Sequence, residues 1–346
     1  MAGRWGSIGD SRDMARVASP RVVIMLSVYV DKFDADDPLA GLVVGDLAES
    51  ETPPDWVDVE VKAAALNHHD LWSLQGVGLP ADRLPMVLGC DAAGLDADGN
   101  EVLVHAVISD PAWLGDETLD PKRSLLSERW PGTLAERVRV PERNVVAKPT
   151  GLSLDEAACL PTAWLTAYRM LFVQSGLRPG DSVLVQGAGG GVATAVIALA
   201  RAAGIRVFAT SRDEAKRHRA EELGAHEALE TGARLPQRVD AVVETVGAAT
   251  WSHSIKSLRP GGTLVIAGAT SGFTPEVGEL NRIFFLQLRI QGSTMGTRDE
   301  LRQLAEFMAL TGVRPLIDRT VTFDQARDGF AALHGGEVFG KVVLTP

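Results

Sequence analysis

The residues best suited to bind a ligand form a glycine-rich turn, Gly187-Ala188-Gly189-Gly190-Gly191. The apolar run 182–186 before it predicts a strand, and the alanine-rich segment 192–203 after it predicts a helix. Glycine allows a sharp turn and lets a pyrophosphate approach the backbone, while the first N–H groups of the helix point at the anion. A further strand is predicted over 206–210, so the whole unit indicates a dinucleotide-binding turn.

The residues just after the second of these strands determine which dinucleotide binds. About 20 residues beyond the turn, an NAD site places an acidic residue on the ribose 2′-hydroxyl. Ser211 stands there instead, followed by Arg212, with Lys216 one helical turn further on. A hydroxyl and two cations suit a 2′-phosphate, which favours NADPH. Asp213 or Glu214 could reverse this preference by binding the hydroxyl, and Arg212 and Lys216 could be ordinary solvated charges at a helix start.

The elements around this unit indicate two kinds of domain. From residue 26 to about 148 the chain reads as short strands separated by turns, and 57–61 alternates strictly between apolar and polar residues. From about Gly151 onward strands alternate with helices, which predicts a parallel, doubly wound sheet. The helix over 154–174 begins with a capping box formed by Ser153 and Glu156. The remaining predicted segments are strands at 26–30, 101–107, 135–140, 241–244, 263–267, 288–291 and 341–344, a tight turn at 259–262, and helices at 299–311 and 324–334.

The bulk composition excludes several classes of protein. The 346 residues are 45% hydrophobic and 23% charged, which argues against disorder, and the formal net charge of −11 argues against nucleic acid as a partner. Two cysteines, Cys90 and Cys159, cannot build a disulfide framework and suit a reducing cytoplasm. The apolar stretch 22–30 is too short to span a membrane, and no cleavage site follows it. We therefore expect a cytoplasmic protein with no membrane partner.

The first residues look like an addition to the fold. Residues 1–24 are polar and rich in glycine, arginine and serine, so we expect a flexible N-terminal extension. The first strand-like pattern begins beside Met25, which makes Met25 a candidate start, and Met1 and Met14 stay open as alternatives.

Several motifs in a fixed order resemble the medium-chain dehydrogenase/reductase superfamily, in particular its zinc-free, quinone-oxidoreductase-like branch. The resemblance extends from about residue 26 to 346 and depends on the glycine turn and on the segments 65–72, 88–94, 132–136, 160–168 and 292–296. It implies an α/β fold with a GroES-like β domain beside a Rossmann domain with a doubly wound parallel sheet. The implied boundaries are 25–150, completed by 296–346, for the GroES-like catalytic domain and 151–295 for the Rossmann domain. The resemblance also implies a homodimer through the last Rossmann strand, near 288–292.

The resemblance places the active site between the domains, where alcohol dehydrogenases of this superfamily bind zinc through a cysteine, a histidine and a second cysteine. The matching positions here are Asn67, Cys90 and Thr162, and this set cannot hold zinc. The segment between 107 and 134 lacks the four cysteines of a structural zinc lobe. We therefore expect no metal. An irregular site remains an alternative, although adjacent histidines on a strand would point to opposite faces; its ligands would be Cys90, His68, His69 and Asp91.

Chemistry without a metal favours particular substrates. Hydride transfer leaves negative charge on the substrate, and a quinone or an α,β-unsaturated carbonyl spreads that charge over a phenolate or enolate. The predicted hydrogen-bond donors are Asn67, with His69 or Thr162 as alternatives; His69 could also supply a proton, or it could be an ordinary hydrogen-bonded histidine. Asp70 matches the family's acid beside the active centre and is expected to orient its neighbours.

The predicted function is NADPH-dependent hydride transfer to a small-molecule quinone or enone. The alternatives are a zinc-dependent alcohol dehydrogenase-like enzyme and a non-catalytic NADPH sensor. The residues expected to bind the cofactor surround the turn and the carboxyl ends of the sheet strands. They are Thr166, Gly187, Gly189, Gly190, Gly191, Val192, Ser211, Arg212, Lys216, Gly247 and Gly268.

Overall fold

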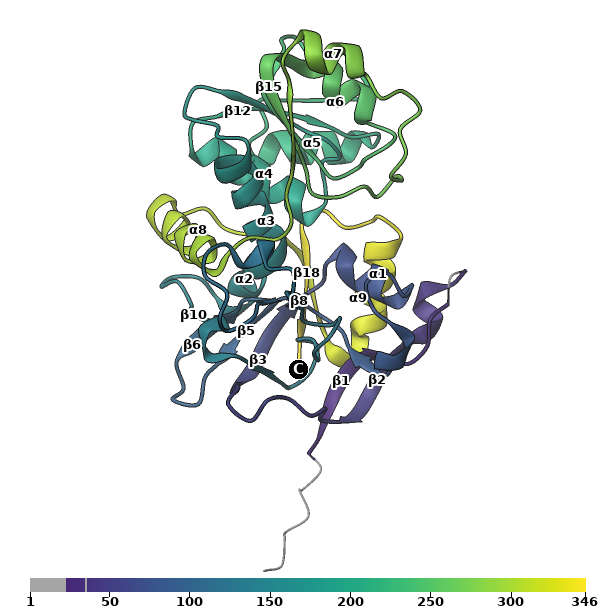
Figure 1. Ribbon diagram of the computed structural model, residues 1–346, viewed down its shortest axis with the longest axis vertical. Helices are drawn as coiled ribbons and strands as arrows, with labels where there is room; N and C mark the ends of the chain where they lie inside the picture. Colours follow the sequence, from purple (N-terminus) through teal and green to yellow (C-terminus); the bar gives the residue numbers. More distant parts are fainter. Residues whose placement is uncertain (1–22, 35) are drawn as a thin grey trace, which may run out of the picture.

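The computed structural model describes residues 23–34 and 36–346 and divides them between two lobes (Figure 1). The expected N-terminal extension lies almost wholly outside the described residues. The first described strand, β1 (Ile24–Val30), confirms the strand predicted over 26–30. Within the described ranges, no helix has both the length and the apolar character needed to cross a membrane.

The lower lobe in Figure 1 is the GroES-like domain, built on a seven-stranded sheet. Its central order is β10-β6-β5-β3-β18-β17, and β9 also pairs with β3. Two strands from the end of the chain, β17 and β18, therefore complete a sheet whose other strands come from the N-terminal half. The bounds of these strands are β3 (Val57–Ala65), β5 (Ala92–Leu95), β6 (Glu101–Val104), β9 (Arg137–Val140), β10 (Val145–Ala147), β17 (Ile317–Thr322) and β18 (Lys341–Thr345).

Smaller elements surround this sheet. A three-stranded sheet contains β1, β2 (Leu42–Ala48) and β4 (Met86–Val87), and a two-stranded one contains β7 (Val107–Ile108) and β8 (Ser124–Leu125). Two helices, α1 (His68–Leu74) and α9 (Ala326–His334), pack against each other. The short 3₁₀ helices are η1 (Pro38–Gly41), η2 (Ala81–Arg83), η3 (Glu117–Leu119), η4 (Glu142–Asn144) and η7 (Phe323–Gln325).

The upper lobe is the Rossmann domain, a parallel six-stranded sheet in the order β13-β12-β11-β14-β15-β16. This order reverses between β11 and β14, and a dinucleotide binds across such a switch point. The strands are β11 (Ser182–Val185), β12 (Arg206–Thr210), β13 (Glu227–Leu229), β14 (Val239–Glu244), β15 (Leu258–Ile266) and β16 (Arg289–Gly292). The helices of this lobe are α4 (Gly191–Ala202), α5 (Glu214–Leu223), α6 (Trp251–Ser257) and α7 (Leu280–Phe285).

A long helical segment precedes the Rossmann sheet. It runs through α2 (Leu154–Ala158), the π-helical turn η5 (Leu160–Trp164), α3 (Leu165–Tyr168) and the π-helical turn η6 (Arg169–Gln174). The predicted capping box is confirmed, because Ser153 Oγ accepts from Glu156 N at 3.2 Å and Ser153 N donates to Glu156 Oε2 at 2.8 Å. The segment packs against α4 and against α8 (Arg298–Thr311). These contacts link the two lobes.

One sequence prediction was wrong, and one strand had no prediction. The segment 259–262 is not a turn before a strand but lies inside β15, where Gly261 takes the left-handed φ of +74° and the pairing with β14 shifts register. The strand β17 was not predicted, because its sequence Ile-Asp-Arg-Thr-Val-Thr is half-exposed and rich in polar residues. Its partner β18 is almost fully buried and was predicted.

Candidate functional site

The glycine turn has the backbone that a pyrophosphate site needs. Gly187 and Gly189 take φ angles of +75° and +133°, which side chains rarely adopt, and Gly190 is the N-cap of α4. A methyl group on Gly191 would lie 2.8 Å from Lys341 Cδ, and one on Gly189 would lie 3.1 Å from Lys216 Cδ. Two lysine side chains therefore pack against the turn, and open space remains beside Gly190 at the start of the helix, where an anion would bind. Val192 follows in the first turn of the helix.

The predicted 2′-phosphate position lies at the end of β12. Ser211 is buried and its Oγ accepts from Asp213 N at 3.2 Å, while Arg212 is exposed. Arg217, which sequence reasoning missed, donates from Nη1 to Ser211 O at 2.8 Å and adds a second guanidinium here. Asp213 Oδ1 accepts from Ala215 N at 2.8 Å, so this carboxylate caps α5.

Lys216 does not turn toward Ser211. Its ammonium donates to Gly336 O and Val338 O, carbonyls of the segment that leads into β18. The side chain therefore passes over the glycine turn and ties the two lobes together. The geometry places its charge beside the pyrophosphate turn, and the role at a 2′-phosphate predicted for it has no support from this arrangement.

The centre of the catalytic lobe is a buried lysine held by three oxygens. Lys341, at the start of β18, is 2% exposed, and its Nζ donates to Leu66 O at 2.7 Å, Asn67 Oδ1 at 2.7 Å and Asp91 Oδ2 at 2.9 Å. Asn67 Nδ2 donates to the same Asp91 oxygen at 2.8 Å and to Ala65 O at 3.3 Å. Both amide hydrogens of Asn67 are thus engaged within the protein, so the substrate-donor role predicted for Asn67 would require these bonds to break.

Asp70 holds the segment that carries Asn67. The Asp70 carboxylate accepts from Asn67 N at 2.8 Å through Oδ2 and from Gly89 N at 3.0 Å through Oδ1. Complete burial raises the pKa of Asp70 to about 7; the two backbone N–H donors and the Lys341 ammonium oppose this shift, while Asp91 adds to it. The contacts suit the orienting role predicted for Asp70.

His69 forms a pair with Glu128, a residue that no sequence motif singles out. His69 Nε2 lies 3.1 Å from Glu128 Oε1, and Nδ1 lies 3.4 Å from Ser73 Oγ. Burial lowers the pKa of His69, while the negative charges of Glu128 and Asp91 act in the opposite direction. The strand geometry considered for His68 and His69 in an irregular metal site does not apply, because α1 begins at His68. On this helix His68 is exposed while His69 faces the Glu128 loop.

The three positions that match zinc ligands do not fit zinc. Asn67 Oδ1 already accepts from an ammonium, and Thr162 is a hydroxyl side chain. Burial, followed by the charge of Asp70, raises the pKa of the Cys90 thiol well above its usual value, and its Sγ donates to Leu126 O at 3.2 Å. Zinc binds the thiolate. No group of three or more histidine, cysteine or acidic side chains within residues 23–34 and 36–346 is arranged to hold a metal ion.

Two hydroxyl groups near the expected nicotinamide position are buried. Thr162 Oγ1 in η5 and Ser293 Oγ just after β16 have no hydrogen-bond partner in the described part of the chain. Thr166, one turn after Thr162, is 7% exposed. Gly247, with φ of +92°, and Gly268 follow the carboxyl ends of β14 and β15, as expected for loops that meet a cofactor.

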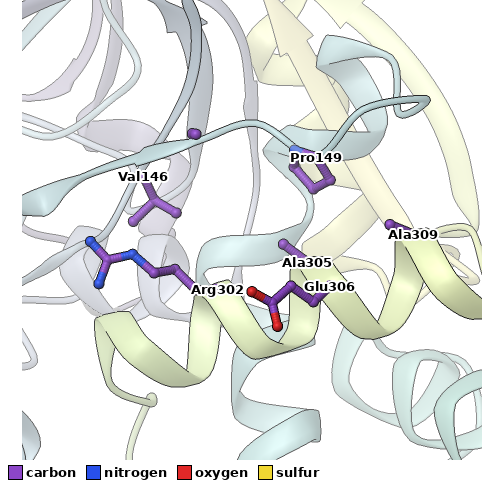
Figure 2. A pocket seen from close by; sticks show the side chains of 7 residues that line it. Val146, Pro149, Arg302, Ala305, Glu306 and Ala309 are labelled. Carbon is purple, nitrogen blue, oxygen red and sulfur yellow. The ribbon is translucent and has the colours of Figure 1, made fainter.

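A groove of about 300 Å³ lies elsewhere (Figure 2). Val146 and Pro149 face the α8 residues Arg302, Ala305 and Glu306 across it. None of these residues belongs to the site described above, and the lining offers no set of groups suited to hydride transfer. The site therefore rests on the glycine turn and the Lys341 centre.

Comparisons with known proteins agree with this arrangement. Residues 53–150 match the family model of the alcohol dehydrogenase GroES-like domain, and residues 191–310 match that of zinc-binding dehydrogenases. A zinc-type alcohol dehydrogenase-like protein of Leptosphaeria maculans is 30% identical over 84% of this chain and 90% of its own length. An acryloyl-coenzyme A reductase of Sulfurisphaera tokodaii is 26% identical over 89% and 98%.

A solved structure extends the likeness to the whole fold. The crystal structure of an NAD-dependent alcohol dehydrogenase is 36% identical and superposes with a TM-score of 0.84 over 93% of this chain and all of that one. The motifs, the two-lobe architecture and these relatives agree. The chain belongs to the medium-chain dehydrogenase/reductase superfamily and is an oxidoreductase that depends on a nicotinamide dinucleotide, NAD(P).

Proposed function

We propose that this protein transfers hydride from NADPH to a quinone or an α,β-unsaturated carbonyl compound without a catalytic metal. The observation that carries the proposal is the buried hydroxyl of Thr162, which has no partner among the described residues although it stands where the superfamily places a zinc ligand. A buried hydroxyl without a partner is costly, and a substrate oxygen would satisfy it. Because Oγ1 is shielded from solvent here, neighbouring side chains must move aside when the substrate binds. The donor set fits a delocalised enolate or phenolate better than an alkoxide.

Each side chain of the site has its own role in the proposed hydride transfer. Bound NADPH would supply the hydride. Thr162 donates a hydrogen bond to the oxygen on which charge develops. The His69–Glu128 pair provides the proton, since the side chain of Glu128 is 29% exposed and can exchange protons with solvent. Lys341 and Asp70 keep Asn67 and its neighbours in place and leave the substrate untouched.

Residues at the end of β12 support the proposed preference for NADPH. Ser211 offers no negative charge to repel a 2′-phosphate, and Arg212 and Arg217 supply two guanidinium groups. The nearest carboxylate in sequence, Asp213, is occupied as a helix cap. The similarity to an acryloyl-coenzyme A reductase supports an activated double bond as the substrate class, because acryloyl thioesters are α,β-unsaturated carbonyl compounds.

A panel of substrates tests the proposal. Oxidation of NADPH at 340 nm is followed with a simple quinone, an enone, an enoyl thioester, an aldehyde and a ketone, each also with NADH. We expect turnover with the quinone, the enone or the enoyl thioester. The enone and the enoyl thioester should each give a product with a saturated carbon–carbon bond. Turnover confined to the aldehyde and ketone would refute the proposed substrate class. Tight NADPH binding with no turnover across the panel would favour a sensor.

We also propose a homodimer formed through β16. All four residues of this edge strand are exposed, and the strand pairs with β15 on one side. Large exposed apolar side chains lie just before it in sequence, at Phe273, Leu280, Phe284 and Phe285. A second copy related by a twofold axis would cover the open edge and these side chains. Sedimentation should give twice the chain mass, and Ile290→Lys should shift it toward the monomer. A monomeric wild-type protein would contradict this assembly.

A further inference from the structure

A chain of buried polar side chains runs beneath the two loops that would hold the dinucleotide. Thr210 ends β12, Gln186 follows β11 and Glu244 ends β14, three neighbouring strands of the parallel sheet. Ser254 from α6 lies between the last two, and all four side chains are fully buried. We call these four residues the polar belt. Apolar side chains would fill such positions more cheaply, so the polar groups need an explanation.

The hydrogen bonds of the polar belt all point the same way, from donor to acceptor, along the line from Thr210 to Glu244. Thr210 Oγ1 donates to Gln186 Oε1 at 2.6 Å, Gln186 Nε2 donates to Ser254 Oγ at 3.0 Å, and Ser254 Oγ donates to Glu244 Oε2 at 2.6 Å. The second hydrogen of Gln186 Nε2 points at His253 Nδ1 at 2.8 Å, which must accept it. Each donor is used, so no member can rotate without leaving a buried group unpaired.

The two ends of the polar belt hold different loops. At one end Thr210 Oγ1 accepts from Gly187 N of the glycine turn at 3.5 Å, and the backbone carbonyl of Thr210 accepts from Ala188 N at 2.7 Å. At the other end Glu244 Oε1 accepts from Val246 N at 2.8 Å and Gly247 N at 3.0 Å, and Oε2 accepts from Thr250 Oγ1 at 2.8 Å. The carboxylate thus receives four hydrogen bonds and folds the loop after β14 around itself.

The loops held in this way also touch each other. A methyl group on Gly187 would lie 2.8 Å from Val246 Cγ2, so the glycine turn and the 245–247 loop are in direct contact. In a sheet of this order the adenosine half of a dinucleotide lies toward β12, and the nicotinamide half lies across the switch point toward β14. The polar belt therefore spans the boundary between the two halves of the cofactor site.

We infer that Gln186 and Glu244 are positioning residues that fix the spacing between the pyrophosphate turn and the nicotinamide loop. Neither needs to touch the cofactor. Glu244 acts through the Val246 and Gly247 N–H groups that it holds, and Gln186 acts through its bonds to Thr210 and Ser254. The inference rests on the proposed function, because it concerns the binding of NADPH. Loss of the polar belt would leave the adenosine subsite intact and let the nicotinamide loop move, and a displacement of about 1 Å costs a reaction up to about 100-fold in rate.

The test compares the whole cofactor with its adenosine half. Binding of NADPH and of 2′,5′-ADP is measured by calorimetry for the wild type, Glu244→Gln and Gln186→Met. We expect both variants to bind NADPH at least about tenfold more weakly and to bind 2′,5′-ADP within about twofold of wild type. The fluorescence enhancement of bound NADPH should fall as well, because it reports the surroundings of the nicotinamide.

The matched control is Asp240→Asn at the opposite end of β14. Asp240 Oδ2 accepts from Ser182 N at 2.8 Å and Ser182 Oγ at 2.6 Å, so its substitution breaks similar bonds away from the cofactor loops. This variant should lose stability but keep the affinity for both ligands. If Glu244→Gln fails to fold, Ser254→Ala removes one hydroxyl and its bonds to Gln186 and Glu244 but leaves the carboxylate on the Val246 and Gly247 N–H groups, and it should give a smaller loss for NADPH alone.

The possible outcomes distinguish a failure of the positioning role from a failure of the proposed function. Unchanged NADPH binding in the belt variants, or an equal loss for NADPH and 2′,5′-ADP, would overturn the positioning role. A wild-type protein that binds neither ligand would overturn the proposed function, and the positioning role would fall with it.

Discussion

Removing the ammonium of Lys341 should destabilise the protein strongly. In Lys341→Met the carboxylate of Asp91, which is fully buried, would retain the Asn67 amide as a donor to Oδ2, and Oδ1 has no partner in the described residues even now. Breaking a buried ion pair by removing one partner costs about 3–5 kcal/mol, because the remaining charge stays in a poor environment. For a chain of 346 residues this loss corresponds to a fall in Tm of about 4–7 °C.

A double-mutant cycle shows whether the loss comes from the charge. Urea unfolding is measured for Lys341→Met, for Asp91→Asn and for the two combined. The combined variant removes both charges, so it should recover about 2–3 kcal/mol relative to the sum of the single losses. A single Lys341→Met variant within about 1 kcal/mol of wild type, or single losses that simply add, would show that the buried pair does not hold the centre together.

Four further perturbations probe the site. Ser211→Asp should weaken NADPH binding about 100-fold and favour NADH, since a carboxylate repels the 2′-phosphate and accepts from the 2′-hydroxyl. If the ratio of the NADPH and NADH dissociation constants were the same in the variant and the wild type, Ser211 would not lie at the 2′-phosphate. Thr162→Val keeps the shape and should lower kcat about 100-fold with little change in the Kd of NADPH, measured by stopped flow. Burial raises the pKa of Asp70 to about 7 from 3.8, so the unfolding free energy of wild type relative to Asp70→Asn should fall, by up to about 4 kcal/mol, as pH rises from about 4 to about 7. Burial also raises the pKa of Cys90 and takes that of Cys159 to about 12, so a thiol reagent at pH 8 should label neither until urea is added; rapid labelling of the folded protein would refute their burial.

The parts of the site that were predictable from sequence are local in the chain. The glycine turn, its flanking strand and helix, and the capping box at Ser153 each lie within a few residues, and backbone sterics and helix capping fix them directly. The position of Ser211 followed from the length of one helix and one strand. The likeness to the superfamily supplied the order of the domains.

The parts that escaped prediction depend on contacts between distant segments. Lys341 reaches Asn67 across 274 residues, and Glu128 reaches His69 across 59, so no periodicity could pair them. Lys216 was assigned by its place one turn after Arg212, but its long side chain reaches carbonyls of the other lobe. Polar residues at strand ends, such as Gln186, look like ordinary loop residues until the sheet brings them together.

Turnover without metal tests the proposed metal-free hydride transfer most directly. The protein is treated with a strong chelator, its zinc content is measured by mass spectrometry, and NADPH oxidation with an enone or quinone is recorded. We predict less than about one zinc per ten chains and an unchanged rate, because Asn67, Cys90 and Thr162 do not form a zinc site. Loss of activity on chelation, restored by one equivalent of zinc, would contradict this prediction.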